Sequence, residues 1–407
     1  MTNAHIEFAK STYLLHTWAE ILDFFTLTGI IMREIKFAQP LVGVDEADEL
    51  KNVINSGVFV HGSYTSSFEE SFRKQTDASA SISVANCTAG LHMAHHYFSK
   101  GKKGEIICPA QTHVATAHAI ELSGLTPVFV DCELETGNIN TDLIADKITE
   151  STIGISVVHF NGIPANLGKL KEICSEYDLY LIEDCAIALG AKYNGVHVGN
   201  HGDAGCFSFH PVKQLTTGEG GMIITSKSHK SEFEYLRAFG VDRNFNQRKR
   251  GGQYDVIRLG FNYRMAELPA AIGFIQLDKL TDFQNRRKEN YRTLEKRIRE
   301  INELKILGID HKDYERSYYS MIVTVDSKKI RNEIQNTLKE NGVGTSVYYP
   351  HPVPRLQYYK QKYGYSAAEF NCSEVISDKS VCLPVGPHLD SRDMLHIANT
   401  LKEALIR

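Results

Sequence analysis

A repeated alternation of short apolar runs with helix-favouring stretches dominates the sequence from residue 80 to residue 184. Each run is rich in Val, Ile and Phe and is apolar on both faces, as expected for strands that helices cover on both sides. Such alternation predicts a mostly parallel sheet with right-handed crossovers, the α/β class of fold. Two further runs follow without a helix between them, so the expected sheet is seven-stranded and flanked by helices. The predicted strands are 81–86, 105–110, 126–131, 154–160, 179–184, 205–209 and 220–226, and the predicted helices between them are 88–99, 113–124 and 166–177.

The sequence changes character after residue 262. Residues 265–304 are charged and favour one long helix, with Pro269 in its first turn, where proline is tolerated. A smaller set of elements follows: a strand at 317–325, a helix at 328–341, an apolar run at 344–350 and a closing helix from Ser391. We therefore predict a large domain at 32–280 and a small C-terminal α+β domain at 281–407.

Residues 1–31 are expected to form an extension ahead of the large domain. Glu20 and Asp23 interrupt the apolar stretch at 18–32, and its charge-free part is about half of the ~20 residues that a membrane span needs. A basic region and a small-residue cleavage site, which would mark a signal peptide, are lacking. The extension is interpreted as an extra helix, or as residues ahead of a true start at Met32, on a cytoplasmic protein without a membrane partner.

Composition excludes several classes of function. The chain has 407 residues, and its 42% hydrophobic content is enough for a sizeable core. A net charge of −4 excludes a strong general attraction to nucleic acid, although the basic cluster at 243–250 is either a contact site or a solvated loop. The eight cysteines contain no CxxC pair, so a metal site and a disulfide framework are not expected, and a reducing cytoplasm fits the pattern.

Two of the predicted strands end in residues that suit ligand binding, because ligands of open α/β sheets bind beyond the carboxyl ends of strands. After the strand at 81–86, Cys87, Thr88 and Ala89 open a helix whose free N–H groups and dipole suit a phosphate. The strand at 179–184 ends with Asp184, a carboxylate that needs a cationic partner when it is buried. Asp184 is either a structural ion-pair or capping residue, or the group that holds a protonated heterocycle.

Lys213 lies between the last two predicted strands, within the segment "FSFHPVKQLTTGEGG". A neutral amine at this point could form a Schiff base with an aldehyde. Together, the phosphate-binding helix start, the acid and the amine are the anchoring set for pyridoxal 5′-phosphate (PLP). In this hypothesis Asp184 holds the ring nitrogen, Lys213 bonds to the aldehyde carbon, and the hydroxyl of Ser208 reaches the phosphate.

Three longer stretches, 164–186, 193–225 and 260–280, then make the sequence similar to a known family. From about Ile35 to the C-terminus, the chain resembles the DegT/StrS sugar aminotransferases, which are PLP enzymes of fold type I. The resemblance implies that Lys213 forms the Schiff base and shifts the proton. It also implies that Asp184 pairs with the ring nitrogen and that the phosphate is held by Thr88, Ala89 and Ser208. Asn262 is expected to reach a phosphate in the second subunit of a homodimer.

Three positions depart from the family pattern. His113 stands where a large aromatic side chain usually stacks on the cofactor ring, and imidazole can stack but also titrates. Ile187 replaces a glutamine near the phenolic oxygen of the cofactor, and Tyr348 replaces a histidine near the active-site strand of the small domain. These changes indicate a divergent branch.

The resemblance predicts an enzyme that moves an amino group, with glutamate as the expected donor, to a keto or aldehyde carbon of a sugar. The leading substrate class is a nucleotide-linked keto sugar for cell-surface polysaccharide or lipopolysaccharide. One alternative is a nucleotide-free sugar of the 3-deoxy-octulosonate type, giving 8-amino-3,8-dideoxy-octulosonate. Another alternative, of a different class, is a PLP-binding regulator without turnover, against which the intact Lys213 argues.

Overall fold

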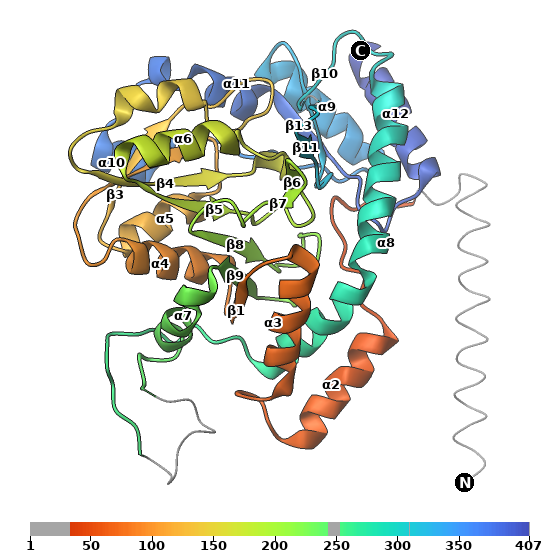
Figure 1. The fold of residues 1–407 in the computed structure, drawn as a ribbon. Helices are drawn as coiled ribbons and strands as arrows, with labels where there is room; N and C mark the ends of the chain where they lie inside the picture. Colours follow the sequence, from red (N-terminus) through yellow and green to blue (C-terminus); the bar gives the residue numbers. More distant parts are fainter. Residues whose placement is uncertain (1–32, 243–252, 309, 407) are drawn as a thin grey trace, which may run out of the picture.

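The computed structural model describes residues 33–242, 253–308 and 310–406 (Figure 1). The predicted extension at 1–31 and the basic cluster at 243–250 lie outside the described residues. In the described part of the chain, every helix falls short of the length or the apolar character that crossing a bilayer requires.

A seven-stranded sheet forms the centre of the fold, as the sequence predicts. Its strands, in spatial order, are β1 (Ala80–Val84), β9 (Gly221–Thr225), β8 (Ala204–Ser208), β5 (Tyr180–Asp184), β4 (Thr152–Val158), β2 (Glu105–Pro109) and β3 (Thr126–Val130). Only β9 runs antiparallel to its neighbours β1 and β8 in this sheet. The segment between β8 and β9 contains no crossover helix, and a direct connection between neighbouring strands gives antiparallel pairing.

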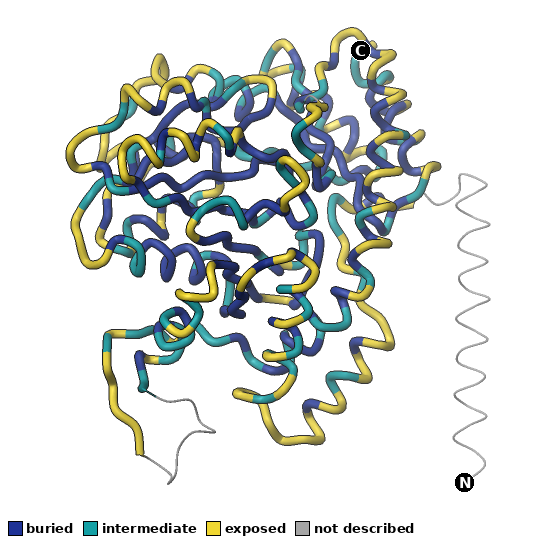
Figure 2. The backbone as a smooth tube through the Cα atoms, viewed as in Figure 1, coloured by how far each residue is buried: buried dark blue, intermediate teal, exposed yellow. Residues whose placement is uncertain are grey.

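Helices cover both faces of this sheet, which explains why its strands are buried along their length (Figures 1 and 2). One face packs against α3 (Ser63–Thr76), α6 (Leu167–Tyr177) and the first half of α8 (Glu267–Ile298). The other face packs against α4 (Cys87–Phe98), α5 (Val114–Leu122) and α7 (Lys230–Leu236). The apolar character on both sides of each predicted strand therefore has its cause in these two helical layers.

A second hydrophobic cluster lies around a small antiparallel sheet near the C-terminus. The sheet has the order β10 (Lys305–Ile306), β12 (Met321–Thr324) and β13 (Ser380–Leu383), and it packs with α9 (Lys328–Glu340) and α12 (Ser391–Ile406). Helix α8 belongs to both clusters, because Leu277 packs with the large sheet and Leu294 with the small one. The predicted boundary at residue 280 falls inside this helix, so the domain division stays a prediction.

Other described helices and strands pack around these two parts. They are α2 (Val44–Ser56), α10 (Gln357–Tyr363), α11 (Asn371–Lys379) and a ribbon of β7 (Val196–His197), β6 (Lys192–Tyr193) and β11 (Tyr314–Glu315). The apolar run at 344–350 forms only one isolated bridge, from Ser346 to Cys382. Asp131 follows β3 and accepts hydrogen bonds from the backbone N–H groups of Cys372 (2.9 Å) and Ser373 (2.9 Å), so it caps α11. This cap ties the large sheet to the C-terminal part.

Candidate active site

The turn from β1 to α4 presents free backbone donors. The side chain of Asn86 caps α4 by accepting a hydrogen bond from the N–H of Ala89 at 2.8 Å. The N–H groups of Cys87 and Thr88, in the first turn, have no intrahelical acceptor. Together with the positive end of the helix dipole, they favour the binding of an anion at the start of α4. The predicted contact of Ala89 with a phosphate would compete with its bond to Asn86.

Gly221 brings strand β9 close to this turn. A Cβ atom at Gly221 would lie 2.7 Å from the nitrogen of Cys87, so only glycine permits β9 to pass so close. Gly221 pairs with Ser208, the last residue of β8. The predicted phosphate ligands at 87–88 and at Ser208 therefore lie on either side of one glycine. This arrangement explains the glycine-rich end of the segment after Lys213.

Asp184 is a buried carboxylate that lacks a cation. It ends β5 with 4% of its surface exposed, and it accepts hydrogen bonds from the hydroxyl of Thr116 (2.8 Å) and the N–H of Ala186 (3.1 Å). Within the described residues no ion pair forms to it. A buried negative charge is costly unless a positive group arrives, so this site fits a ligand that presents a protonated nitrogen. The sequence interpretation did not include Thr116, which orients the carboxylate.

Lys213 lies in the turn between β8 and β9 and is half-buried. Its Nζ atom lies over the ring of Tyr319, 5.7 Å from the ring centre. In the part of the chain that the structure describes, this amine makes neither an ion pair nor a hydrogen bond. The side chain is thus available to an aldehyde, and Tyr319 is a neighbour that the sequence pattern gave no reason to select.

Electrostatic effects on Cys87 link these residues into one site. Burial raises the pKa of the Cys87 thiol well above its usual range, the charge of Asp184 adds to the rise, and the charge of Lys213 opposes it. Because a Coulomb interaction weakens with distance, the acid and the amine both lie close enough to the buried start of α4 to act on this thiol. The phosphate-binding turn, the acid and the amine, which are far apart in sequence, are therefore brought together.

His113 and Asn262 lie at the margin of this group. His113 is the N-cap of α5, its Nδ1 accepts a hydrogen bond from the N–H of Ala115 at 3.2 Å, and its ring lies 5.6 Å from that of Tyr349. Asn262 is exposed and pairs with Ala238 in an isolated bridge. Its side chain makes no contact with Lys213 in the described residues, so its predicted role stays a prediction about a second subunit.

The two other departures from the family pattern have structural counterparts. The side chain of Ile187 is buried, and its carbonyl accepts a hydrogen bond from Nε2 of Gln214 at 2.6 Å. The amide of Gln214 also donates to the hydroxyl of Ser317 at 2.9 Å, so it is committed to the scaffold. Tyr348 shares a hydrogen bond with Tyr319, with 3.1 Å between the two hydroxyl oxygens.

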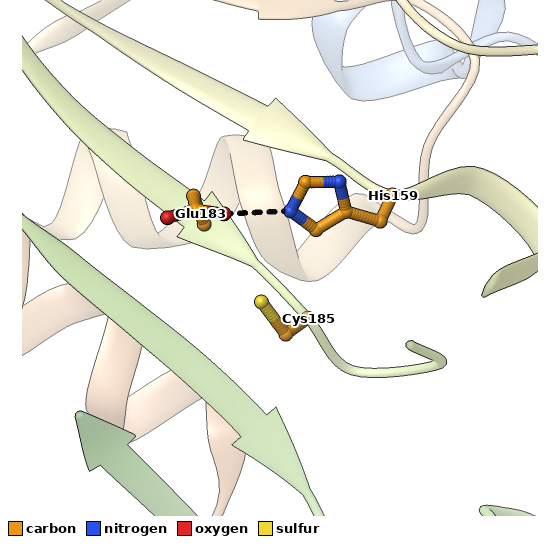
Figure 3. Close-up of side chains that lie close together, drawn as sticks. All are labelled: His159, Glu183 and Cys185. Carbon is orange, nitrogen blue, oxygen red and sulfur yellow. Dashed lines mark hydrogen bonds and ion pairs between the residues drawn. The ribbon is translucent and has the colours of Figure 1, made fainter. Parts of the chain in front are cut away.

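His159, Glu183 and Cys185 form a buried cluster beside the site (Figure 3). The carboxylate of Glu183 accepts from Nε2 of His159 (2.9 Å) and from the N–H groups of Gly199 (2.7 Å), His201 (2.8 Å) and Gly202 (2.6 Å). Burial alone would raise the pKa of Glu183, but these hydrogen bonds outweigh it and hold the pKa below its usual value. These four hydrogen bonds use the lone pairs of the carboxylate, which leaves none to coordinate a metal ion. The cluster therefore serves to fix the 199–202 loop.

The residues at the site fit PLP. The helix start offers donors for a phosphate, the buried acid lacks the positive partner that a pyridinium nitrogen provides, and the amine is free to bond with an aldehyde. The fold and the site therefore define a PLP-dependent aminotransferase of fold type I.

Comparisons with known proteins agree with this class. The sequence profile of the DegT/DnrJ/EryC1/StrS aminotransferase family matches residues 40–402. The chain is 32% identical over 377 residues to GDP-perosamine synthase of Escherichia coli O157:H7, covering 91% of this chain and 99% of that protein. This chain belongs to the DegT/DnrJ/EryC1/StrS aminotransferase family, and it is a sugar aminotransferase that uses PLP.

Solved structures resemble the fold closely. The protein Spr1654 from Streptococcus pneumoniae, known in PLP and PMP forms, is 26% identical in its PMP form with a TM-score of 0.86, covering 91% of this chain and 98% of that one. DesI, solved in the presence of its TDP-sugar product, is 27% identical with a TM-score of 0.81, covering 93% of this chain and 94% of that one.

Proposed function

We propose that this chain transfers the amino group of glutamate to the keto carbon of a nucleotide-linked sugar, in the formation of cell-surface polysaccharide or lipopolysaccharide. The observation that carries this proposal is the 32% identity with GDP-perosamine synthase over 99% of that protein, whose name specifies a GDP-linked product. The likeness to DesI, which was solved with its TDP-sugar product, supports the same substrate class.

Each residue of the site has a proposed task. Bound PLP supplies an aldehyde that condenses with amines and a ring that accepts electrons. The N–H groups of Cys87 and Thr88 and the hydroxyl of Ser208 bind the phosphate, which fixes the cofactor at one end. Asp184 keeps the ring nitrogen protonated, and Thr116 orients that carboxylate through its 2.8 Å hydrogen bond.

Lys213 has two tasks in this proposal. Its amine would bond to the aldehyde carbon between turnovers, and once released it would carry the proton of the 1,3-shift between the two carbons that flank the transferred nitrogen. The amine lies in a half-buried position without a hydrogen-bond partner among the described residues, which leaves it free to reach the cofactor. His113 borders the ring position, where an imidazole takes the place of a larger aromatic ring.

A substrate screen tests the proposed function. The enzyme is loaded with glutamate, the amino form of the cofactor is isolated, and keto sugars are added one at a time while the absorption of the lysine-bound cofactor is followed. We expect GDP- or dTDP-linked keto sugars to restore that absorption and to yield an amino sugar by mass spectrometry. Restoration only by a nucleotide-free 3-deoxy-octulosonate-type sugar would overturn the nucleotide-linked class, and failure of glutamate to form the amino form would overturn the donor.

We also propose that the active unit is a homodimer with shared sites. Large apolar side chains are exposed on two loops, and the hollow beside them is lined in part by Phe239, Val256 and Arg264. The exposed side chains are Val58, Phe59 and Val60 on one loop and Phe239, Val256, Ile257 and Leu259 on the other. Exposed apolar surface of this kind suits an interface, and Asn262 lies beside it.

Mixing inactive variants tests the shared site. If Asn262 acts in the partner's site, a mixed dimer of Lys213→Ala and Asn262→Ala contains one intact site. After full subunit exchange, half of the dimers are mixed and half of their sites are intact, so about one quarter of wild-type activity is expected. The matched control mixes Lys213→Ala with Asp184→Asn, whose defects lie in the same subunit's site, and it should recover nothing. Equal recovery in the two mixtures, or none in either after proven exchange, would contradict the proposal.

A further inference from the structure

The segment from Ser317 to Tyr319, which precedes β12, contacts the lysine turn at two adjacent residues. The hydroxyl of Ser317 accepts a hydrogen bond from the side chain of Gln214 at 2.9 Å. The ring of Tyr319 lies against Nζ of Lys213, with 5.7 Å between the nitrogen and the ring centre. Because two independent contacts join these segments, the position of the ring relative to the amine is set by the fold rather than by one flexible side chain.

Tyr319 is itself held firmly. Only 3% of its surface is exposed, and its carbonyl accepts a hydrogen bond from Nη1 of the buried Arg287 at 3.1 Å. Its hydroxyl pairs with that of Tyr348 at 3.1 Å, and the two rings lie 5.7 Å apart at an angle of 32°. A phenol ring fixed at both its backbone and its hydroxyl cannot turn away from the amine without breaking a buried hydrogen bond.

Tyr348 anchors the pair to the rest of the molecule. Its carbonyl accepts from Nε2 of Gln111 at 2.9 Å, and Oε1 of Gln111 accepts from the hydroxyl of Ser377 at 3.1 Å. The ring of Phe37 packs edge-on against it at 5.8 Å. Burial raises the pKa of Tyr348, so the phenol stays neutral and can share a proton with Tyr319 over the working pH range.

We propose that Tyr319 is a positioning residue for Lys213, whose ring face holds the ammonium form of the free lysine, and that the hydroxyl of Tyr348 fixes the orientation of that ring. The inference rests on the proposed role of Lys213 as the amine that leaves and rejoins the cofactor in every cycle. The negative face of an aromatic ring attracts a cation within about 6 Å of its centre. A long, flexible side chain thereby returns to the same place each time it is released.

A graded series of substitutions tests the ring. Phenylalanine and its mono-, tri- and pentafluoro analogues are placed at position 319 in the full-length chain, because fluorine weakens the ring quadrupole while nearly keeping the shape. The readout is the rate at which a limiting amount of an amine-reactive acylating reagent modifies Lys213 in the cofactor-free protein at fixed pH. Peptide mass spectrometry measures this rate. Only the neutral amine reacts, so we expect the rate to rise stepwise with fluorination, by about three- to tenfold in total. A rate that does not change along the series would overturn the proposal.

A pair of hydroxyl deletions tests the role of Tyr348. Tyr319→Phe and Tyr348→Phe should each raise the acylation rate of Lys213 by about twofold, and the double variant should not exceed either single one, because both changes remove one shared hydrogen bond. The matched control is Tyr318→Phe, since the ring of Tyr318 faces Arg292 and Arg316 instead of Lys213, and it should leave the rate unchanged. Additive effects, or an equal effect of Tyr318→Phe, would overturn the assignment to this hydroxyl pair.

The acylation measurements and the test of the proposed function can fail separately. Whether Lys213 bonds to PLP is decided by the absorption of the loaded protein, whereas the acylation rate is measured without the cofactor. If the covalent bond is found and fluorination has no effect, only the positioning role of Tyr319 fails. If fluorination has the expected effect and no covalent bond forms, the proposed function fails and the contact remains.

Discussion

Lys213→Ala is expected to abolish transamination, with a loss on the order of 10⁴-fold, because one side chain supplies both the covalent link to the cofactor and the proton carrier. Purified wild-type protein should absorb near the visible edge of the ultraviolet as a result of the bond between Lys213 and the aldehyde carbon. The variant should lose this band while still binding PLP through the helix start and Ser208. Absorption spectra and the rates of both half-reactions measure these two effects separately.

Two control variants define what the result means. Lys213→Arg keeps a positive charge at the same place, but its guanidinium does not form a Schiff base with an aldehyde. It should therefore be as inactive as the alanine variant. Lys227→Ala removes an exposed lysine that follows the end of β9 opposite to Gly221, and it should change neither the absorption band nor the rates. An unchanged spectrum in Lys213→Ala would exclude the assignment of this residue.

Much of the large sheet could be predicted because its strands are buried on both faces. Five apolar runs, with helical stretches in three of the four intervals between them, leave few arrangements other than a parallel sheet, and the residues after each run then fall at one edge. The segment after β1, the end of β5 and the turn after β8 were selected in this way. The strand ends do converge, because Asp184 pairs with Cys206 on β8, and Gly221, the partner of Ser208, passes close to the nitrogen of Cys87.

Other parts of the site could not be predicted because they depend on packing between distant segments. Thr116 contacts Asp184 across 68 positions of sequence, and nothing in the α5 segment marks this threonine as different from its neighbours. Tyr319 lies just before β12, in a run whose pattern predicts only a core position. The run at 344–350 has the composition of a strand, but it passes the small sheet with a single bridge at Ser346 and places Tyr348 against Tyr319 instead.

Asp184→Asn is expected to slow both half-reactions by about 10²- to 10³-fold, because an amide cannot hold a proton on the ring nitrogen by charge. The covalent band of the loaded protein should still form, since the aldehyde and Lys213 are untouched. In the cofactor-free protein the substitution should leave the free energy of unfolding within about 1 kcal/mol of wild type. The reason is that it removes a buried charge without a cationic partner among the described residues, and the side-chain oxygen can still accept from Ala186. A variant as fast as wild type would mean that the partner of the ring nitrogen lies elsewhere.

Glu183→Gln is the matched control, since it makes the same chemical change one residue away, on the opposite face of β5. The carboxylate of Glu183 accepts four hydrogen bonds, two on each oxygen. The glutamine amide would replace one oxygen by an NH₂ group, which faces two of these N–H donors and cannot accept from them. We therefore expect a loss of about 3 kcal/mol in the free energy of unfolding. The half-reaction rates of the folded protein should stay near those of wild type.

The pH dependence of that loss separates charge from shape. The folded-state pKa of Glu183 lies below the unfolded value of about 4.3, so its contribution is complete above that pH and is lost as the pH falls through the folded pKa. The difference in unfolding free energy between wild type and Glu183→Gln should therefore be constant near neutral pH and shrink in acid. Two neighbouring carboxylates on one strand would then have different roles. Asp184, which lacks a cationic partner within the described residues, would determine the half-reaction rates. Glu183, which accepts four hydrogen bonds, would determine the free energy of unfolding. Equal stability losses in the two variants would contradict this division, because the Asp184 charge would then already be compensated by the protein.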